Sequence, residues 1–280
     1  MVFKAAICPS CGGKLEVPDD RDLVKCTYCG TDIMVRQAIQ NVNGKNIHNY
    51  LELAETAFDS GNFFEAYGYY SKVLEIDVKN TKAWFGKGKS GGWQSTIENS
   101  RFPEMISAFK KSIDYSPKEN KKSIQILCAS EIARIFPLYY NHLRKSALAQ
   151  SSEERVWENY VFQSRNLISL LEFGHSLDLD NREIILGIIR ICKHILEGMP
   201  YECYTRNGPI QGVRRVSEGD KRFLSKKINE YSTFLGKVDP NFKPPTIQRK
   251  YISIAEGWVY FILIIILIVF LLWIFDGQIM

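Results

Sequence analysis

Apolar side chains recur at helical spacing from position 47 onward, and one break in the period divides the first stretch in two. Leu51, Ala54 and Phe58 fall on one face of a helix. Gly61 and Asn62 interrupt the period, which then resumes at Phe63, Ala66, Tyr70, Val73 and Leu74. The pattern predicts a hairpin of two helices joined by a tight turn, with an apolar seam between them.

The hairpin pattern is repeated 34 residues later, since Tyr50 and Trp84 are 34 positions apart, as are Ala54 and Gly88. This period is that of the tetratricopeptide repeat. The residues resemble that family at Tyr50, Leu53, Ala54, Ala57, Ala66 and Tyr70 in the first copy, and at Trp84, Gly88, Phe109 and Pro117 in the second. The resemblance covers about 47–118 and implies an α-α superhelix with a groove for protein partners.

The two copies depart from the family pattern at three places. Val78 stands where the family usually has Pro, and Met105 replaces a small Ala. Five extra residues lie in the turn around Asn99 to Pro103. The sequence alone assigns no groove residues.

Gly86 to Ser90 reads Gly-Lys-Gly-Lys-Ser, which resembles the core of a phosphate-binding loop. That loop requires a glycine at position 83, where this chain has Ala83, and a preceding buried strand, where the pattern predicts a helix and a turn. We therefore interpret Gly88 as the small residue that lets two helices approach closely, with Trp84 as a packing aromatic.

Apolar stripes continue through 119–238 and predict degenerate helical repeats. One stripe includes Ile124, Ile132 and Ile135, and later helices are predicted near 152–177 and 184–196. Residues 200–216, with several glycines and arginines, are interpreted as a surface loop. Ser217 to Asp220 is a helix-start pattern, and a proline-containing juxtamembrane linker is expected at 239–256.

The last apolar stretch, 257–275, has 19 residues without a charge. About 20 apolar residues span a hydrocarbon core of about 30 Å, and Trp258, Tyr260 and Trp273 lie near its ends as interfacial aromatics do. The alternative, a buried globular helix, rarely lacks polar residues over such a length. Because basic residues precede the span, we expect a single-pass, tail-anchored membrane protein with its N-terminal bulk in the cytoplasm.

The charge is unevenly distributed along the chain. Residues 1–181 carry 22 basic and 22 acidic side chains, whereas 182–250 carry 14 basic and 7 acidic ones. This excess is a topology signal and a solvated surface, with direct attraction to anionic lipid as a further contribution. The role of the basic loop at 205–216 stays open.

Four of the seven cysteines form two Cys-x-x-Cys pairs, each followed by glycine: Cys8, Cys11, Cys26 and Cys29. This spacing suits a tetrahedral zinc site, and the segment resembles the zinc ribbon family. We expect a hairpin between the pairs, formed by the stretches around 15–17 and 23–24, with a third strand at 33–35. Four cysteine ligands leave no position for water, so the Zn2+ is expected to be structural.

Iron is an alternative to zinc at such a site, whereas disulfides are disfavoured in a reducing cytoplasm. A thioredoxin-like pair would need a βαβ context that is absent. Residues 1–36 carry five basic and five acidic side chains. Nucleic-acid contact is therefore less expected than protein contact or simple self-folding.

Together these patterns predict a mainly α protein: a tetratricopeptide-like superhelix with a small β zinc ribbon and one transmembrane helix. The expected segments are a ribbon at 1–36, a linker at 37–46, two repeats at 47–118, degenerate repeats at 119–238, a juxtamembrane linker at 239–256 and the span at 257–275. The predicted function is a membrane-anchored scaffold for unidentified protein partners. The alternative is a membrane-associated nucleic-acid-binding protein using the ribbon and 182–250. No enzymatic activity, catalytic residue or small-molecule substrate is predicted.

Overall fold

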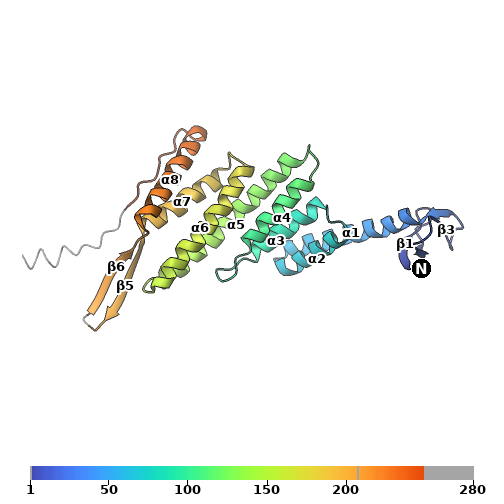
Figure 1. Cartoon of the computed structure of the whole chain (residues 1–280), viewed down its shortest axis with the longest axis horizontal. Helices are drawn as coiled ribbons and strands as arrows, with labels where there is room; N and C mark the ends of the chain where they lie inside the picture. Colours follow the sequence, from blue (N-terminus) through green and yellow to red (C-terminus); the bar gives the residue numbers. More distant parts are fainter. Residues whose placement is uncertain (1, 207, 249–280) are drawn as a thin grey trace, which may run out of the picture. The chain divides into compact units, whose positions relative to one another are not determined.

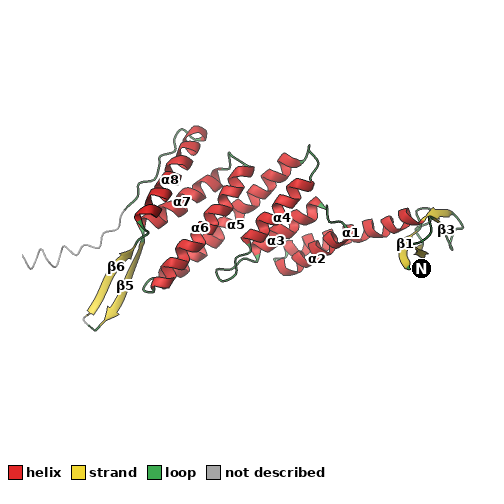
Figure 2. Ribbon diagram, viewed as in Figure 1, coloured by secondary structure: helices red, strands yellow, loops and turns green. Residues whose placement is uncertain are grey.

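Antiparallel helices make up most of the chain after the N-terminal strands (Figures 1 and 2). The structure, a computed structural model, describes residues 2–206 and 208–248. Among these residues no helix is long and apolar enough to cross a membrane. The predicted span at 257–275 lies outside the described residues.

The chain divides into two compact units, each containing parts of the long central helices. The first unit comprises Met1–Leu143 and Gln163–Gly187, and the second comprises Arg144–Phe162 and Ile188–Met280. The helices that contribute to both units are α5 (Lys121–Ala149), α6 (Glu154–Leu177) and α7 (Arg182–Glu197).

The N-terminal segment consists of two separate antiparallel hairpins. Strand β1 (Phe3–Ile7) pairs with β2 (Lys14–Pro18), with Phe3 opposite Pro18, and β3 (Leu23–Lys25) pairs with β4 (Asp32–Met34). The predicted pairing of 15–17 with 23–24 is therefore wrong, whereas the predicted strand at 33–35 is present as β4, one residue earlier, and pairs with β3. Each Cys-x-x-Cys turn connects the two strands of its own hairpin, so the strand before each pair finds its partner directly after it.

Helix α1 (Val35–Asp59) begins immediately after β4. The prediction of a linker at 37–46 is therefore wrong, because that segment is helical. Val35 and Ala38 are buried with Ala6, Val17 and Ile33 in the core of the N-terminal segment. The polar composition of 37–46 reflects the exposed face of a helix whose other face has a tertiary partner.

Helices α1, α2 (Phe63–Ile76), α3 (Thr81–Trp93) and α4 (Phe102–Tyr115) pack each against the next, as expected for two tetratricopeptide-like hairpins. Gly61, with φ 82°, allows the tight turn between α1 and α2. The side chains of Asn62 and Asn80 cap α2 and α3 by accepting hydrogen bonds from the N–H groups of Glu65 and Ala83.

The glycine-rich stretch lies inside α3, so the phosphate-loop interpretation is excluded by both its conformation and its surroundings. A Cβ added at Gly88 would lie 2.7 Å from the ring of Phe109, and one at Gly86 would lie 2.2 Å from the ring of Tyr70. At Gly92 the nearest atom would be the sulfur of Met105, at 2.5 Å. These glycines therefore allow α3 to pack closely against α2 and α4.

In the second unit, a β-hairpin over 199–214 occupies most of the segment 200–216 that the sequence analysis predicted to be a surface loop. Strand β5 (Met199–Thr205) pairs with β6 (Gly208–Arg214), and Gly208 has a φ of 110° at the turn. The sequence gives no clear strand signal here, because the segment has few apolar residues and several glycines. The base of the hairpin is secured by Arg214, whose guanidinium stacks on Tyr201 and donates to the carbonyl oxygens of Ser151 and Ser152 at 3.2 and 2.6 Å.

Helix α8 (Glu218–Val238) follows the hairpin, and its predicted start is confirmed. The Ser217 side chain accepts a hydrogen bond from the N–H of Asp220. Leu224, Ile228, Tyr231 and Leu235 form its buried face.

His194 on α7 is expected to make the stability of the second unit sensitive to acid. Burial, then the positive charges of Arg144, Lys193 and Arg190, lowers its pKa from 6.5 to about 4. The unfolded chain therefore binds more protons than the folded one between these values, so stability is complete above pH 6.5 and falls as the pH drops toward 4. Because His194 is only partly buried, we expect a loss on the order of 1 kcal/mol.

Urea unfolding at pH 7.5 and pH 4.5 measures this contribution. The variant His194→Gln should lose less stability than the wild type on acidification, whereas His48→Gln, at an exposed position, should behave as the wild type does. An acid-induced loss of equal size in His194→Gln and the wild type would show that His194 is not responsible.

Candidate metal centre and interaction pocket

The structure brings all four predicted ligands together at one point. The sulfur atoms of Cys8, Cys11, Cys26 and Cys29 lie within 4.8 Å of one another. Cys8 Sγ is 3.8 Å from Cys29 Sγ, and Cys11 Sγ is 3.7 Å from Cys26 Sγ. A tetrahedral zinc ion with Zn–S bonds of about 2.3 Å separates its sulfur ligands by about 3.8 Å. These spacings fit a tetrahedral metal ion and are too long for disulfides.

The two Cys-x-x-Cys turns have the same backbone construction. The N–H of Cys8 donates to the carbonyl of Gly13, and the N–H of Gly12 donates to that of Cys8, both at 2.9 Å. Cys26, Gly30 and Thr31 repeat these two bonds in the second turn. Gly12 and Gly30 have φ values of 73° and 70°, a conformation that side chains rarely adopt, so each glycine is needed to close its turn.

Polar neighbours favour the thiolate form at part of the cluster. Hydrogen bonds from the side chain and backbone of Thr31 lower the pKa of Cys29 to about 6. The pKa of Cys8 is also lowered, first by the backbone N–H of Cys11. At Cys11 the backbone N–H of Gly13 lowers the pKa, but the neighbouring thiols, Cys29 first, and burial raise it to about 12. Four thiolates this close need a cation to be ionised together.

The donor set and burial are those of a structural site. Cys8 and Cys26 are buried, while Cys11 and Cys29 are exposed. Four sulfur ligands complete a tetrahedral shell, so a bound ion has no open position for water or substrate. Zinc and iron are both compatible with four thiolates in this geometry.

The N-terminal segment, which has no net charge, exposes several large apolar side chains on its surface. Leu23 and Met34 lie opposite each other across β3 and β4, and both are exposed. Phe3 and Tyr28 are exposed as well, whereas Lys4 is paired with Asp19 at 3.4 Å. Exposed apolar pairs favour contact with protein, and a phosphate-binding surface would instead require clustered positive charge.

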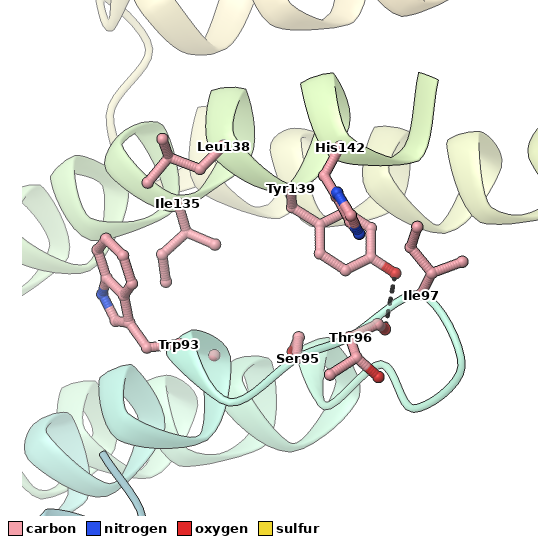
Figure 3. Close-up of a pocket in the computed structure, with 9 residues that line it drawn as sticks. Trp93, Ser95, Thr96, Ile97, Ile135, Leu138, Tyr139 and His142 are labelled. Atoms are coloured by element: carbon pink, nitrogen blue, oxygen red, sulfur yellow. Dashed lines mark hydrogen bonds between the residues drawn. The ribbon is translucent and has the colours of Figure 1, made fainter. Parts of the chain in front are cut away.

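A second candidate site is a pocket of about 210 Å³ in the first unit, between α3, the following loop and α5 (Figure 3). Its apolar walls come mainly from Trp93, Ile97, Ile135, Leu138 and Tyr139. Figure 3 shows Trp93 and Ile135 at one end, with Ile97 below Tyr139 and His142 at the other. Leu138 is 58% exposed, so it forms an apolar rim at the mouth of the pocket.

The loop wall of this pocket is held by hydrogen bonds from three directions. The Tyr139 hydroxyl donates to the Thr96 carbonyl at 3.1 Å, drawn as a dashed line in Figure 3. The Gln163 side chain donates to the Ile97 carbonyl at 3.2 Å, and Arg101 donates to the side chain of Gln94 at 2.6 Å. The carbonyl groups of Thr96 and Ile97 in this wall therefore each accept a hydrogen bond from another part of the same unit.

A buried carboxylate fixes the aromatic wall. Glu131 on α5 is only 5% exposed; it accepts a hydrogen bond from the indole N–H of Trp93 at 2.5 Å and one from Arg134 at 2.9 Å. Trp93 also stacks on Phe63, with ring centroids 5.3 Å apart.

On the same helix as Trp93, Lys89 lies 3.7 Å above the ring of Phe58, and burial lowers the pKa of its ammonium group.

The sequence analysis located the four cysteines but did not assign this pocket. Its one signal was the lengthened turn around Asn99 to Pro103, which departs from the repeat pattern in the same α3–α4 connection. The side chains from α5 have no such signal, because Ile135 and Tyr139 look like ordinary core residues in the sequence.

No protein-family model matches this chain, and none of the curated proteins matches it. Among solved structures, a mutant O-GlcNAc transferase of Thermobaculum terrenum is similar at 12% identity and a TM-score of 0.30, over 68% of this chain and 26% of that chain. This chain thus spans about a quarter of that enzyme.

Two further similar structures match over most of their length. MamA from Desulfovibrio magneticus RS-1 is 10% identical over 69% of this chain and 97% of its own, with a TM-score of 0.27. YrrB, described as a TPR protein with an unusual peptide-binding site, covers 74% and 92% at 10% identity, also at 0.27. TM-scores this low do not establish a common arrangement, so the assignment of tetratricopeptide-like hairpins rests on the 34-residue period and on the packing of α1 to α4.

Proposed function

We propose that this protein is a membrane-tethered scaffold whose helical hairpins bind a segment of a partner protein. The observation that carries the proposal is the pocket lined by Trp93, Ile135, Leu138 and Tyr139, which is open to solvent and has an exposed apolar rim. Its volume of about 210 Å³ is below the roughly 300–1,000 Å³ of small-molecule pockets. It therefore suits one bulky apolar side chain projecting from a peptide.

The rigidity of the pocket supports binding without rearrangement. The indole of Trp93 is held by Glu131, and the loop carbonyls of Thr96 and Ile97 are held by Tyr139 and Gln163. A preformed pocket avoids the entropy cost of ordering side chains when the partner binds. A bulky aromatic side chain of the partner is the expected anchor, because aromatic residues are enriched among those that carry most of the binding energy of an interface.

The membrane tether and the metal are further parts of the proposal. The apolar stretch at 257–275 supplies the anchor, with the basic residues before it on the cytoplasmic side. The four-cysteine cluster holds a structural Zn2+, which stabilises a segment too small to fold on its own apolar core. The exposed apolar pair Leu23 and Met34 makes that segment a second surface for protein contact.

Replacing Leu138 with glutamate tests the pocket. The substitution adds a charge to the apolar rim at an exposed position, so we expect wild-type folding but at least tenfold weaker capture of the partner, since burying an unpaired charge costs more than about 1.4 kcal/mol. A photocrosslinking residue at Ile97 in intact cells identifies the partner, and the yield of its adduct is the measurement.

Leu179→Glu is the matched control, because Leu179 is 60% exposed and lies in the same unit but does not line the pocket. This variant should keep the full yield of the adduct. Equal yields from Leu138→Glu and the wild type would contradict docking at this pocket. Binding that falls steeply with salt would instead favour the nucleic-acid alternative.

A further inference from the structure

The distal half of the β5–β6 hairpin carries exposed apolar side chains on both of its faces. Cross-strand partners share a face, and successive residues alternate between faces. Tyr204 is opposite Pro209 on one face, and Cys203 is opposite Ile210 on the other. Tyr204 is 81% exposed and Ile210 is about half exposed.

The hairpin is held firmly at its base, so its tip has a defined position within the second unit. Arg214 stacks on Tyr201 and donates to two carbonyls of the α5–α6 turn, while Gly212 lies under the ring of Tyr201. In Figure 1 the two strands run side by side to a turn that lies away from α8. A two-stranded ribbon is marginal in water unless a face is covered, and here the base is covered while the tip is not.

The turn of the hairpin carries one exposed basic residue. Arg206 at the turn is exposed, whereas Arg214, the last residue of β6, lies at the base of the hairpin. The hairpin lies within the stretch 182–250, where basic residues outnumber acidic ones by 14 to 7. Tyrosine, isoleucine and arginine together match the interface of a bilayer, where aromatic rings lie at headgroup level and arginine binds phosphate.

The described chain ends close to the hairpin. The N–H of Gln248 donates to Glu197 Oε1 at 3.4 Å, two residues before β5 begins. Gly257, where the predicted span begins, is nine residues further along the chain, a distance of at most about 30 Å when extended. A hairpin of seven-residue strands is about 20 Å long. The tip and the start of the span can therefore reach one bilayer surface.

We propose that the tip of the β5–β6 hairpin, formed by Tyr204, Arg206 and Ile210, binds the headgroup region of a bilayer containing anionic lipid. This inference rests on the membrane tether of the proposed function. The contact gives the second unit a fixed orientation at the membrane, which a single flexible connection to the span would not. A strand from a partner protein would pair along an edge of the hairpin and would not require apolar residues on both faces.

Photocrosslinking in reconstituted vesicles tests the contact. The full chain, with a benzophenone amino acid at position 204, is inserted into phosphatidylcholine vesicles with or without phosphatidylserine. Adducts are identified by mass spectrometry. We expect lipid adducts from position 204, and at least about fivefold fewer after Arg206→Glu, because the substitution removes a cationic contact worth roughly that factor and adds a charge that the anionic surface repels.

The same photocrosslinker at Phe64 is the matched control, because Phe64 on α2 is 79% exposed and aromatic but belongs to the first unit. It should give little lipid adduct. Similar lipid yields at both positions, no adduct at 204, or an adduct with a second copy of the chain would each overturn the inference. An alkaline wash distinguishes failure of the hairpin contact from failure of the membrane tether. Protein that stays in the vesicles without crosslinking contradicts only the hairpin contact. Protein that washes off contradicts the tether as well.

Discussion

Replacing Cys26 with serine is expected to abolish metal binding and to unfold the N-terminal segment, while the helical hairpins remain folded. Cys26 lies in a core of seven buried side chains, two of which, Cys8 and Cys26, are candidate metal ligands. Structural zinc sites contribute apparent binding free energies of about 10–16 kcal/mol to the folding of small domains. A segment of this size has no apolar core large enough to compensate for that loss.

The consequence should extend into α1. Val35 and Ala38 pack against the ribbon core, whereas Ile47 and Tyr50 pack with the helical hairpins. When the ribbon unfolds, residues 35–46 lose their tertiary partner, and an isolated polar helix of this length is marginal in water. Hydrogen exchange should therefore become fast up to about residue 46 and stay slow beyond it.

Metal content measured by mass spectrometry should fall from one ion per chain to near zero in Cys26→Ser and should identify the metal in the wild type. Cys203→Ser, at a partly exposed cysteine of the β5–β6 hairpin, should keep its metal. Treating the wild type with a chelator should reproduce the exchange pattern of Cys26→Ser. A full complement of metal in that variant would refute the four-cysteine site.

The second large effect is expected from Gly88→Leu, which should disrupt the packing of α3 against α4. Even a single added carbon would lie 2.7 and 2.8 Å from two ring atoms of Phe109 and 3.1 Å from the Cβ of Ala108. Phe109 is fully buried and stacks on Phe85, so it has no space into which to move. Overpacking by one or two carbons costs about 1–3 kcal/mol, and a whole leucine side chain should cost more than about 4 kcal/mol.

Thermal unfolding followed by circular dichroism measures this effect, and Gly68→Leu provides a control with the opposite sign. Gly68 lies in α2 and is exposed, and a Cβ there would meet nothing within 4 Å. Leucine at that position should stabilise the helix by up to about 1 kcal/mol through its higher helix propensity. Wild-type-like unfolding of Gly88→Leu would contradict the close packing of these helices.

The two candidate sites differ in how much of each could be predicted from the sequence. The cluster of four cysteines was predictable because its residues are local: each Cys-x-x-Cys-Gly turn supplies half of the candidate ligands within five residues. The pocket was not, because it joins Trp93 and the lengthened α3–α4 turn to Ile135, Leu138 and Tyr139, about forty residues away in the sequence. Nothing in a helical period distinguishes Leu138, which is exposed, from Ile135, which is buried.

The sequence by itself determined the helical hairpins, their 34-residue period, the four clustered cysteines and the reason for glycine at position 88, since these depend on spacing along the chain. Tertiary structure decided three other features. Residues 37–46 are helical because Val35 and Ala38 are buried against the ribbon, and each ribbon strand pairs across its own cysteine turn. Residues 199–214 form a hairpin whose base is secured by contacts from Arg214 to residues more than 60 positions earlier. Partners distant in sequence leave no periodic signal, so only the folded chain reveals them.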